Sequence, residues 1–124
     1  MGEEKNKDVF GKALLGFAEG GPMTYKVRRD DGWVEEAFIE VYFQESCEWS
    51  SLDKRVLDCA KGRVLDVGAG AGRHSLYLQK KRMEVFPVDI SPGAIQVMKS
   101  RGVKNVQLMD IRDHKDSQVI RNIM

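Results

Sequence analysis

The sequence contains few cysteines, almost no excess of charge of either sign, and no long apolar run. Its two cysteines, Cys47 and Cys59, do not form a C-x-x-C pair. We therefore interpret them as reduced thiols of a cytoplasmic protein rather than as a disulfide. Twenty basic residues balance 19 acidic ones, which leaves no electrostatic footprint for nucleic acid or for an anionic membrane. No apolar run approaches the roughly 20 residues that span a bilayer, and the polar N-terminus is unlike a secretory signal.

The first half of the chain carries helix-like patterns without a clear fold signature. Residues 1–60 are expected to form an N-terminal helical extension or lid. Apolar residues recur at helical spacing in three segments, which are residues 7–18, 36–44 and 52–60. In the last segment one apolar stripe is formed by Leu52, Val56, Leu57 and Ala60. Between the first two, Asp30-Asp31-Gly32 is a turn signal that predicts a hairpin of residues 24–28 and 33–36.

The second half, residues 61–124, alternates strand and helix patterns. Strands are predicted at residues 63–67, 84–88 and 106–109, with helices at 73–81 and 92–101 between them. Ser91 is a favourable N-cap of the second helix and Gly102 suits the position after its end. The order β-α-β-α-β requires parallel strands with right-handed crossovers. The predicted fold class is therefore α/β, a Rossmann-like doubly wound parallel sheet.

An acid follows or ends each predicted strand, and glycines alternate after the first one. The run Asp66-Val67-Gly68-Ala69-Gly70-Ala71-Gly72 leads from strand to helix, while Asp89 and Asp110 end the next two strands. Ligands of such sheets bind beyond the carboxyl ends of the strands. A loop this rich in glycine lets its backbone approach a ligand closely. The sequence therefore predicts a ligand site at this edge, unless each acid only caps a turn or helix.

The first ligand to consider is a nicotinamide dinucleotide. Its fingerprint is G-x-G-x-x-G, whereas this loop has glycine at 68, 70 and 72 and Arg73 after them. The carboxylate of Asp66 would also stand near the pyrophosphate. Like charges ~5 Å apart repel by roughly 3 kcal/mol at an effective dielectric of about 20. A ligand with a positive group at this position would instead be attracted.

S-adenosylmethionine fits that requirement, because it carries an ammonium, a sulfonium and no phosphate. Asp66 would meet the ammonium, and the backbone of Gly68–Gly72 would approach the methionine part. Asp89 would accept both ribose hydroxyls, since a carboxylate has two acceptor oxygens. Ile90 would lie against the adenine face, and Asp110 would accept the adenine amino group with Ile111 nearby.

These motifs resemble those of class I S-adenosylmethionine-dependent methyltransferases. Asp66 to Gly72 is similar to their first motif, Val88-Asp89-Ile90-Ser91 to the next, and Met109-Asp110-Ile111 to the one after. The resemblance covers about residues 62–113. It implies a mostly parallel seven-stranded sheet with helices on both faces, a three-layer α/β/α arrangement. It also implies cofactor contacts from Asp66, Gly68, Ala69, Gly70, Asp89, Ile90, Asp110 and Ile111.

Other residues have weaker signals. His74, on the first turn of the helix after the loop, is either a catalytic base or a surface or capping residue, and no catalytic residue is nominated. Lys80, Lys81 and Arg82 suit the negative end of a helix dipole better than a phosphate patch. Five aromatic residues of the first half either line a substrate lid or pack in the core: Tyr25, Trp33, Tyr42, Phe43 and Trp49. Histidine and cysteine show no metal-ligand spacing.

The sequence after the third strand carries no motif of the fourth strand that the resemblance implies. Residues 116–124 therefore leave the first strand of the sheet without its neighbour, and an open apolar edge is an aggregation hazard. We expect a truncated or split methyltransferase, or an edge covered by the tail, a partner chain or a second copy. Two other functions stay open: a non-catalytic module that binds the nucleoside or a partner, and a nicotinamide-dependent oxidoreductase. Near-neutral charge weakly favours a small-molecule methyl acceptor.

Overall fold

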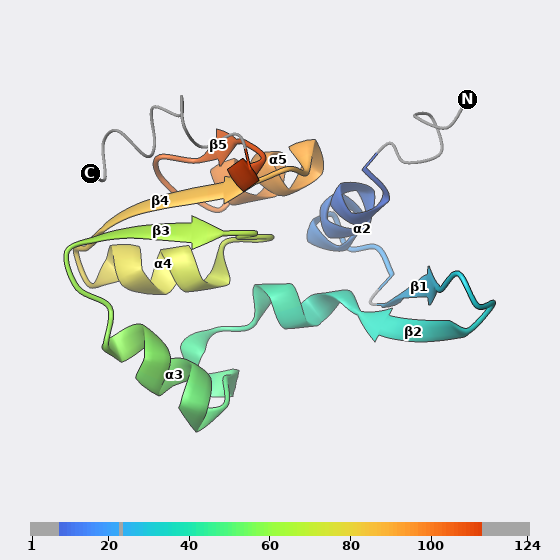
Figure 1. Ribbon diagram of the computed structural model, residues 1–124, viewed down its shortest axis with the longest axis horizontal. Helices are drawn as coiled ribbons and strands as arrows, with labels where there is room; N and C mark the ends of the chain where they lie inside the picture. The colour runs from blue at the N-terminus through green and yellow to red at the C-terminus, as the bar shows by residue number, and fades with distance from the viewer. Residues whose placement is uncertain (1–7, 23, 113–124) are drawn as a thin grey trace.

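The computed structural model describes residues 8–22 and 24–112 of the 124-residue chain. Two small sheets and a set of short helices follow one another along it (Figure 1). The first half contains α2 (Val9–Ala18), β1 (Thr24–Arg28), β2 (Val34–Phe38), the 3-10 helices η1 (Ile39–Phe43) and η2 (Ser46–Glu48), and α3 (Ser51–Asp58). The second half contains β3 (Arg63–Val67), α4 (Arg73–Lys80), β4 (Glu84–Asp89), α5 (Pro92–Ser100) and β5 (Gln107–Leu108).

The second half forms the predicted parallel sheet. Its strand order is β3-β4-β5, both pairings are parallel, and Val67 lies opposite Val88. Strand β4 is buried on both sides from Val85 to Asp89, as expected for the central strand of a parallel sheet. Each of the three strands and two helices falls within a few residues of its predicted bounds. The α/β class with parallel strands is thereby confirmed.

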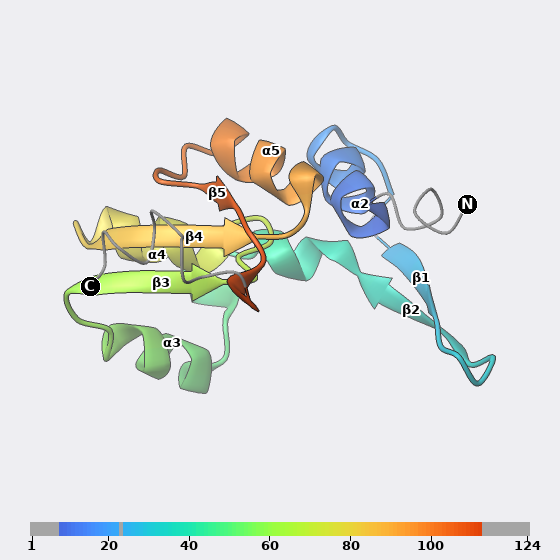
Figure 2. The same cartoon turned by 45° about the horizontal axis from the view of Figure 1, so that its top comes forward.

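Helices α4 and α5 lie on one face of this sheet. Successive strands are added in one direction, so right-handed crossovers bring α4 and α5 to the same side. Figure 2 shows α4 behind β4 and α5 above β5, with α3 below β3. Residues 8–22 and 24–112 therefore form two layers, and a helix layer on the other face is not among them. The segment 116–124, discussed for the fourth strand, lies outside the described residues.

The N-terminal segment packs on the sheet domain and shares its core. Helix α2 crosses α5 so closely that a Cβ on Gly93 would lie 2.5 Å from the backbone of Gly11. Small residues at this crossing let the two backbones meet. One buried cluster joins the two halves of the chain, and it contains Leu14, Ile39, Ala71, Ala94 and Val97. The N-terminal elements are thus held at the end of the sheet where the strands point (Figure 1).

One expectation for the first half was wrong in part. Residues 36–44 were predicted as a helix, but β2 continues to Phe38 and only a 3-10 helix follows. The antiparallel partner decides this, because Phe38 pairs with Thr24 across the hairpin. Helix α3 forms where it was predicted, and in its apolar stripe Leu52 is 68% and Val56 62% exposed, whereas Leu57 and Ala60 are half-buried. Among the described residues no helix is both long enough and apolar enough to cross a membrane.

Candidate functional site

The loop between β3 and α4 needs glycine at alternate positions. Gly68, Gly70 and Gly72 have φ angles of 68°, 60° and 81°, a region that L side chains rarely enter. The N–H of Gly68 donates to the Val88 carbonyl at 2.9 Å, which fixes the loop to β4. A Cβ on Gly72 would lie 2.8 Å from Val103 Cγ2, whereas none of the described atoms lies within 4 Å of a Cβ on Gly68. The loop is therefore tightly packed at Gly72, whereas at Gly68 no neighbouring protein atoms cover it.

Asp89 joins the end of β4 to this loop. Its Oδ2 accepts the N–H of Gly70 at 2.9 Å, and its Oδ1 accepts the N–H of Ser91 at 3.0 Å. The residue is buried, with 8% of its surface exposed. Each carboxylate oxygen has two lone pairs, so each can accept one further hydrogen bond. Ile90 follows with 69% of its surface exposed, which leaves an uncovered apolar side chain beside a fixed carboxylate.

Asp66 lies on β3 just before the loop and is half-buried. The Ser75 hydroxyl, on the first turn of α4, donates to its Oδ2 at 2.6 Å. Burial raises the pKa of the Asp66 carboxyl, although the hydrogen bond from Ser75 acts in the opposite direction, and the Asp89 charge adds to the rise. The site therefore holds two interacting acids within a partly desolvated edge. A cation placed there would relieve both the repulsion and the desolvation.

Asp110 follows β5, but its carboxylate is already paired. The Arg112 Nε donates to both carboxylate oxygens at 3.0 Å, and Arg112 Nη2 pairs with Oδ2. This hydrogen-bonded arginine lowers the pKa of Asp110 to about 2. Ile111 lies between the two and is half-buried. The sequence prediction placed Asp110 near the other acids but did not foresee the arginine two residues later as its partner.

The remaining predicted contact, Ala69, points its side chain into the core. It packs on the cluster of Ile95, Met98 and Val103, so only its backbone borders the loop surface. Met109, before Asp110, donates its N–H to the Asp89 carbonyl at 2.9 Å, which ties β5 to the same edge. The predicted acids at the ends of β4 and β5 are thus connected through one backbone hydrogen bond.

Two aromatic residues cover the glycine loop. A Cβ on Gly70 would lie 3.3 Å from Tyr42 Cδ1, and the Phe10 ring packs edge-on against Tyr42 with 5.1 Å between centroids. Burial, with a hydrogen bond to Tyr42, raises the pKa of Tyr25 to about 12. Tyr42 thus lies against the loop from the lid side, while Trp33 is exposed on the hairpin, outside both the core and the site. Phe10 was not predicted here, since its helical spacing indicated only a core position.

Asp8 also reaches this edge, and no sequence pattern indicated it. Its Oδ1 accepts the Ser91 hydroxyl at 2.5 Å and the N–H of Gly11 at 3.0 Å, while its Oδ2 accepts the N–H of Gly93 at 2.6 Å. One carboxylate therefore caps the N-termini of both α2 and α5. It fastens α2 beside Asp89, which precedes Ser91 by two residues.

His74 is half-buried beside Trp49 rather than free on the helix surface. The two rings meet edge-on with 5.0 Å between centroids. Its Nε2 is buried and has no hydrogen-bond partner in the described part of the chain. Burial lowers the pKa of His74, and the neighbouring Arg73 charge adds to this effect. His74 therefore remains a neutral ring on the α4 face toward Trp49.

Comparisons with known proteins agree with this geometry. Residues 64–118 match a family described as "Methyltransferase domain". The structure is similar to a SAM-dependent methyltransferase from Bacteroides fragilis solved in complex with S-adenosyl-L-homocysteine, with a TM-score of 0.75 and 32% identity. That match covers 90% of this chain and 46% of the other, so the chain spans under half the length of that relative.

A second solved structure is similar in fold alone. It comes from work on the conversion of a disulfide bond into a thioacetal group during echinomycin biosynthesis, with a TM-score of 0.54 and 23% identity. The match covers 89% of this chain and 42% of that one. No curated protein matches the chain.

Proposed function

We propose that this chain, whose residues 64–118 match a methyltransferase domain family, binds S-adenosylmethionine at the carboxyl edge of its parallel sheet and supplies the cofactor site of a class I methyl transfer. The observation that carries the proposal is the bare loop at Gly68 between two interacting acids, Asp66 and Asp89. A phosphate-bearing nucleotide would add negative charge to this place. We therefore rank the nicotinamide-dependent oxidoreductase below the methyltransferase.

Each predicted contact has a role that its surroundings support. Asp66 holds the ammonium, because burial and the Asp89 charge favour a cation beside it. Asp89 accepts the ribose diol with the lone pairs that Gly70 and Ser91 leave free. Ile90, which is largely exposed, covers one face of the adenine.

Three further contacts complete the proposed site. The backbones of Gly68, Ala69 and Gly70 border the methionine part. Asp110, whose carboxylate is held by the backbone and side chain of Arg112, is the proposed partner of the adenine amino group, and Ile111 lies next to it. The ligand requires no side chain at Gly68, where a Cβ would project into open space. This open space supports a close approach of the ligand to the backbone at Gly68.

Bound S-adenosylmethionine supplies an electrophilic methyl group on a positively charged sulfur. The protein residues orient the cofactor and limit access of water, and no enzyme nucleophile is required. Tyr42 and Phe10 pack against the loop at Gly70, and we infer that the acceptor binds beside these rings. Their apolar surface and the near-neutral charge of the chain favour a small molecule as acceptor.

The test is a calorimetric titration of the folded chain with S-adenosylhomocysteine. Asp66→Asn and Asp89→Asn should each weaken binding by roughly 10- to 100-fold, since a hydrogen bond to a charged group contributes about 1.5–3 kcal/mol. Asp30→Asn, on the exposed turn of the hairpin, is the matched control and should bind normally. NADH should not bind. Unchanged affinity in both site variants, or tighter binding of NADH, would refute the assignment.

A methyl-transfer assay separates an enzyme from the non-catalytic module. The measurement is S-adenosylhomocysteine release from S-adenosylmethionine in the presence of small acceptors. Release above the rate without acceptor supports the enzyme. Binding of the nucleoside without release of S-adenosylhomocysteine, whichever acceptor is added, supports the non-catalytic module. The chain covers 46% of the Bacteroides fragilis protein, which is the reason to test for such a module.

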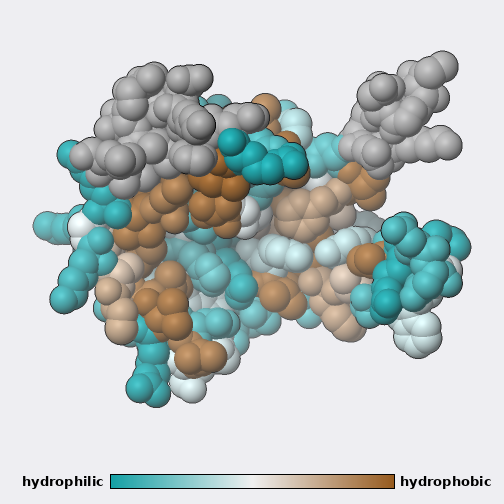
Figure 3. Space-filling view, viewed as in Figure 1, coloured by the Kyte–Doolittle hydropathy of each residue, from teal (hydrophilic) through white to brown (hydrophobic). Residues whose placement is uncertain are grey.

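The outer edge of β3 is the proposed contact for a partner chain or a second copy. In the described sheet β3 pairs only with β4, and Leu52 and Val56 on α3 are exposed. Figure 3 shows apolar side chains gathered along β3 and α3. Light scattering should give a mass above that of one chain, and Val56→Lys should lower it.

We also propose a reducing, cytoplasmic location, because Cys47 and Cys59 are exposed free thiols.

A further inference from the structure

A cavity lies beside α4. It has a volume of about 400 Å³ and lies between α4, the segment from Gln44 to Trp49, and the end of α5. Leu76, Tyr77 and Lys80 line it from α4, while Ser75 and Leu78 on the same helix are buried. None of the proposed cofactor contacts lines this cavity, although Arg73, directly after the glycine loop, does.

The cavity contains a half-buried cation without a counter-ion. Arg101, just after α5, forms no ion pair in the described chain, and Glu45 is the acid whose charge acts on it. Its guanidinium stacks on Phe43 at 4.9 Å and donates through Nη1 to the Ala71 carbonyl at 2.7 Å. Guanidinium has five N–H donors, so most stay available. A partly desolvated cation is costly unless it is paired.

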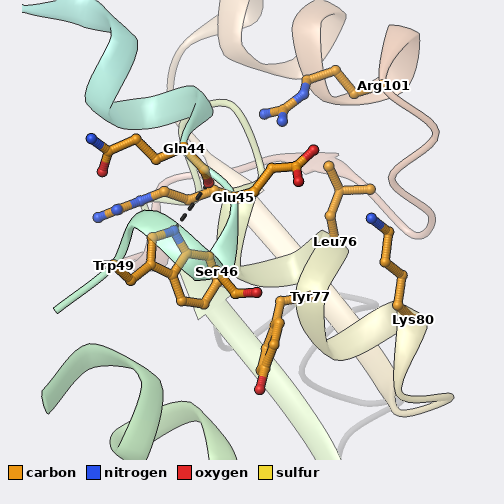
Figure 4. A pocket seen from close by; sticks show the side chains of 9 residues that line it. Gln44, Glu45, Ser46, Trp49, Leu76, Tyr77, Lys80 and Arg101 are labelled. Atoms are coloured by element: carbon orange, nitrogen blue, oxygen red, sulfur yellow. Dashed lines mark hydrogen bonds between the residues drawn. The ribbon is translucent and has the colours of Figure 1, made fainter. Parts of the chain in front are cut away.

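A second cation and an apolar wall complete the cavity. Figure 4 shows Leu76 between the Arg101 and Lys80 side chains, the Glu45 carboxylate on the Arg101 side of Leu76, and Tyr77 further along α4, away from Arg101. Lys80 has no ion pair within residues 8–22 and 24–112, whereas its neighbour Lys81 is paired with Asp58. Trp49 fixes the opposite wall, since its Nε1 donates to the Gln44 carbonyl at 3.0 Å.

We propose that this cavity is a second ligand site, which binds a small organic anion with a flat apolar part and communicates with the glycine loop through Arg101. The anion lies between Arg101 and Lys80, and its apolar part lies on Leu76 and Tyr77. The ligand is an effector rather than a methyl acceptor, because none of the proposed cofactor contacts lines the cavity. Three cations, Arg73, Lys80 and Arg101, against one acid, Glu45, give the selectivity for negative charge.

The communication follows from the hydrogen bond to Ala71. That carbonyl lies between Gly70, whose N–H donates to Asp89, and Gly72, which caps α4. An anion that draws the Arg101 guanidinium changes this hydrogen bond, and linkage requires that the cofactor then change anion affinity by the same factor. This coupling rests on the proposed cofactor site, whereas anion binding itself does not.

The binding test uses Trp49 fluorescence in the Trp33→Phe chain, where Trp49 is the only tryptophan left. The probe is phenyl phosphate, with inorganic phosphate and benzyl alcohol as controls for charge alone and ring alone. We expect a saturable change with phenyl phosphate, and at least about fivefold weaker binding of either control. No saturable change, or equal binding of benzyl alcohol, overturns the site.

Lys80→Gln locates the anion, with Lys99→Gln as the matched control. Lys99 is also exposed and basic near a helix end but does not line the cavity. Lys80→Gln should weaken phenyl phosphate binding by roughly fivefold, a modest loss because Lys80 is exposed, and Lys99→Gln should not. Equal losses in the two variants would mean that net charge alone attracts the probe, which overturns the proposed location.

The coupling is measured as S-adenosylhomocysteine affinity with and without saturating phenyl phosphate. We expect a change of at least about threefold, a small coupling on the usual scale. Lys80→Gln should leave the affinity without phenyl phosphate unchanged, because Lys80 does not touch the cofactor edge. Saturable probe binding without any change in nucleoside affinity refutes the coupling. Probe binding in a chain that binds no nucleoside refutes the cofactor assignment and leaves the second site standing.

Discussion

Replacing Gly68 with alanine should separate ligand binding from stability. Gly68 has φ of 68°, and Gly62, at the opposite end of β3, has φ of 67°. None of the described atoms lies within 4 Å of a Cβ at either position. The two substitutions therefore introduce the same backbone strain, about 1–2 kcal/mol for an alanine in the left-handed region, and no clash within the protein.

The two variants should differ only in affinity for the nucleoside. The Cβ of Gly68→Ala would occupy the space that the proposed cofactor requires, so S-adenosylhomocysteine should bind at least about tenfold more weakly, or 1.4 kcal/mol. Gly62→Ala should bind like the unmodified chain. Urea unfolding measures the shared loss of stability and calorimetry the affinities. Equal affinity of both variants for S-adenosylhomocysteine would refute our view that the backbone at Gly68 borders the ligand.

Three further substitutions test the charges at this edge. Because burial raises the pKa of Asp66 above 3.8, its ionisation costs stability as pH rises through the folded pKa. Asp66→Asn should therefore gain unfolding free energy relative to the unmodified chain between pH 4 and 7. A difference in unfolding free energy that stays constant across that range would contradict this. Burial alone would raise the pKa of Asp8, but hydrogen bonds from Ser91 and two backbone amides outweigh it and lower the pKa. Asp8→Asn should thus cost about 1 kcal/mol of unfolding free energy at pH 7, measured by urea titration. This loss should disappear as the pH falls below 3.8, the ordinary pKa of an aspartate. An equal loss at low pH would count against the capping of both helices by Asp8. Arg112→Ala should return the pKa of Asp110 from about 2 toward 3.8 in an NMR titration, without weakening the binding of S-adenosylhomocysteine. Weaker binding of S-adenosylhomocysteine would show that Arg112 itself binds the ligand.

The parallel sheet could be predicted because its signals are local. Each strand is short and apolar, and Ser91 caps α5 through the N–H of Ala94, as its position before Pro92 predicts. The alternating glycines after β3 likewise permit the positive φ angles of this turn without steric cost. These elements therefore formed where the sequence indicated, and three acids at the strand ends followed from the topology alone.

The partners of those acids could not be predicted, since they depend on contacts distant in sequence. Nothing local indicates that Asp8 reaches Ser91, 83 residues away in the chain. The segment 36–44 has helical spacing, but its pairing with β1 prevails over this preference. The exposure of Leu52 and Val56 on α3 and the stacking of Tyr42 over Gly70 arise in the same way, from packing between the two halves of the chain.

The account can be tested most directly by an NMR titration of the isotope-labelled chain with S-adenosylhomocysteine. Saturable amide shifts should be largest at Gly68, Gly70, Ile90 and Ile111, around the carboxyl edge of β3, β4 and β5, and small in the hairpin of β1 and β2. Shifts centred on the hairpin, or no saturable shifts in a folded sample, would contradict the proposed cofactor site.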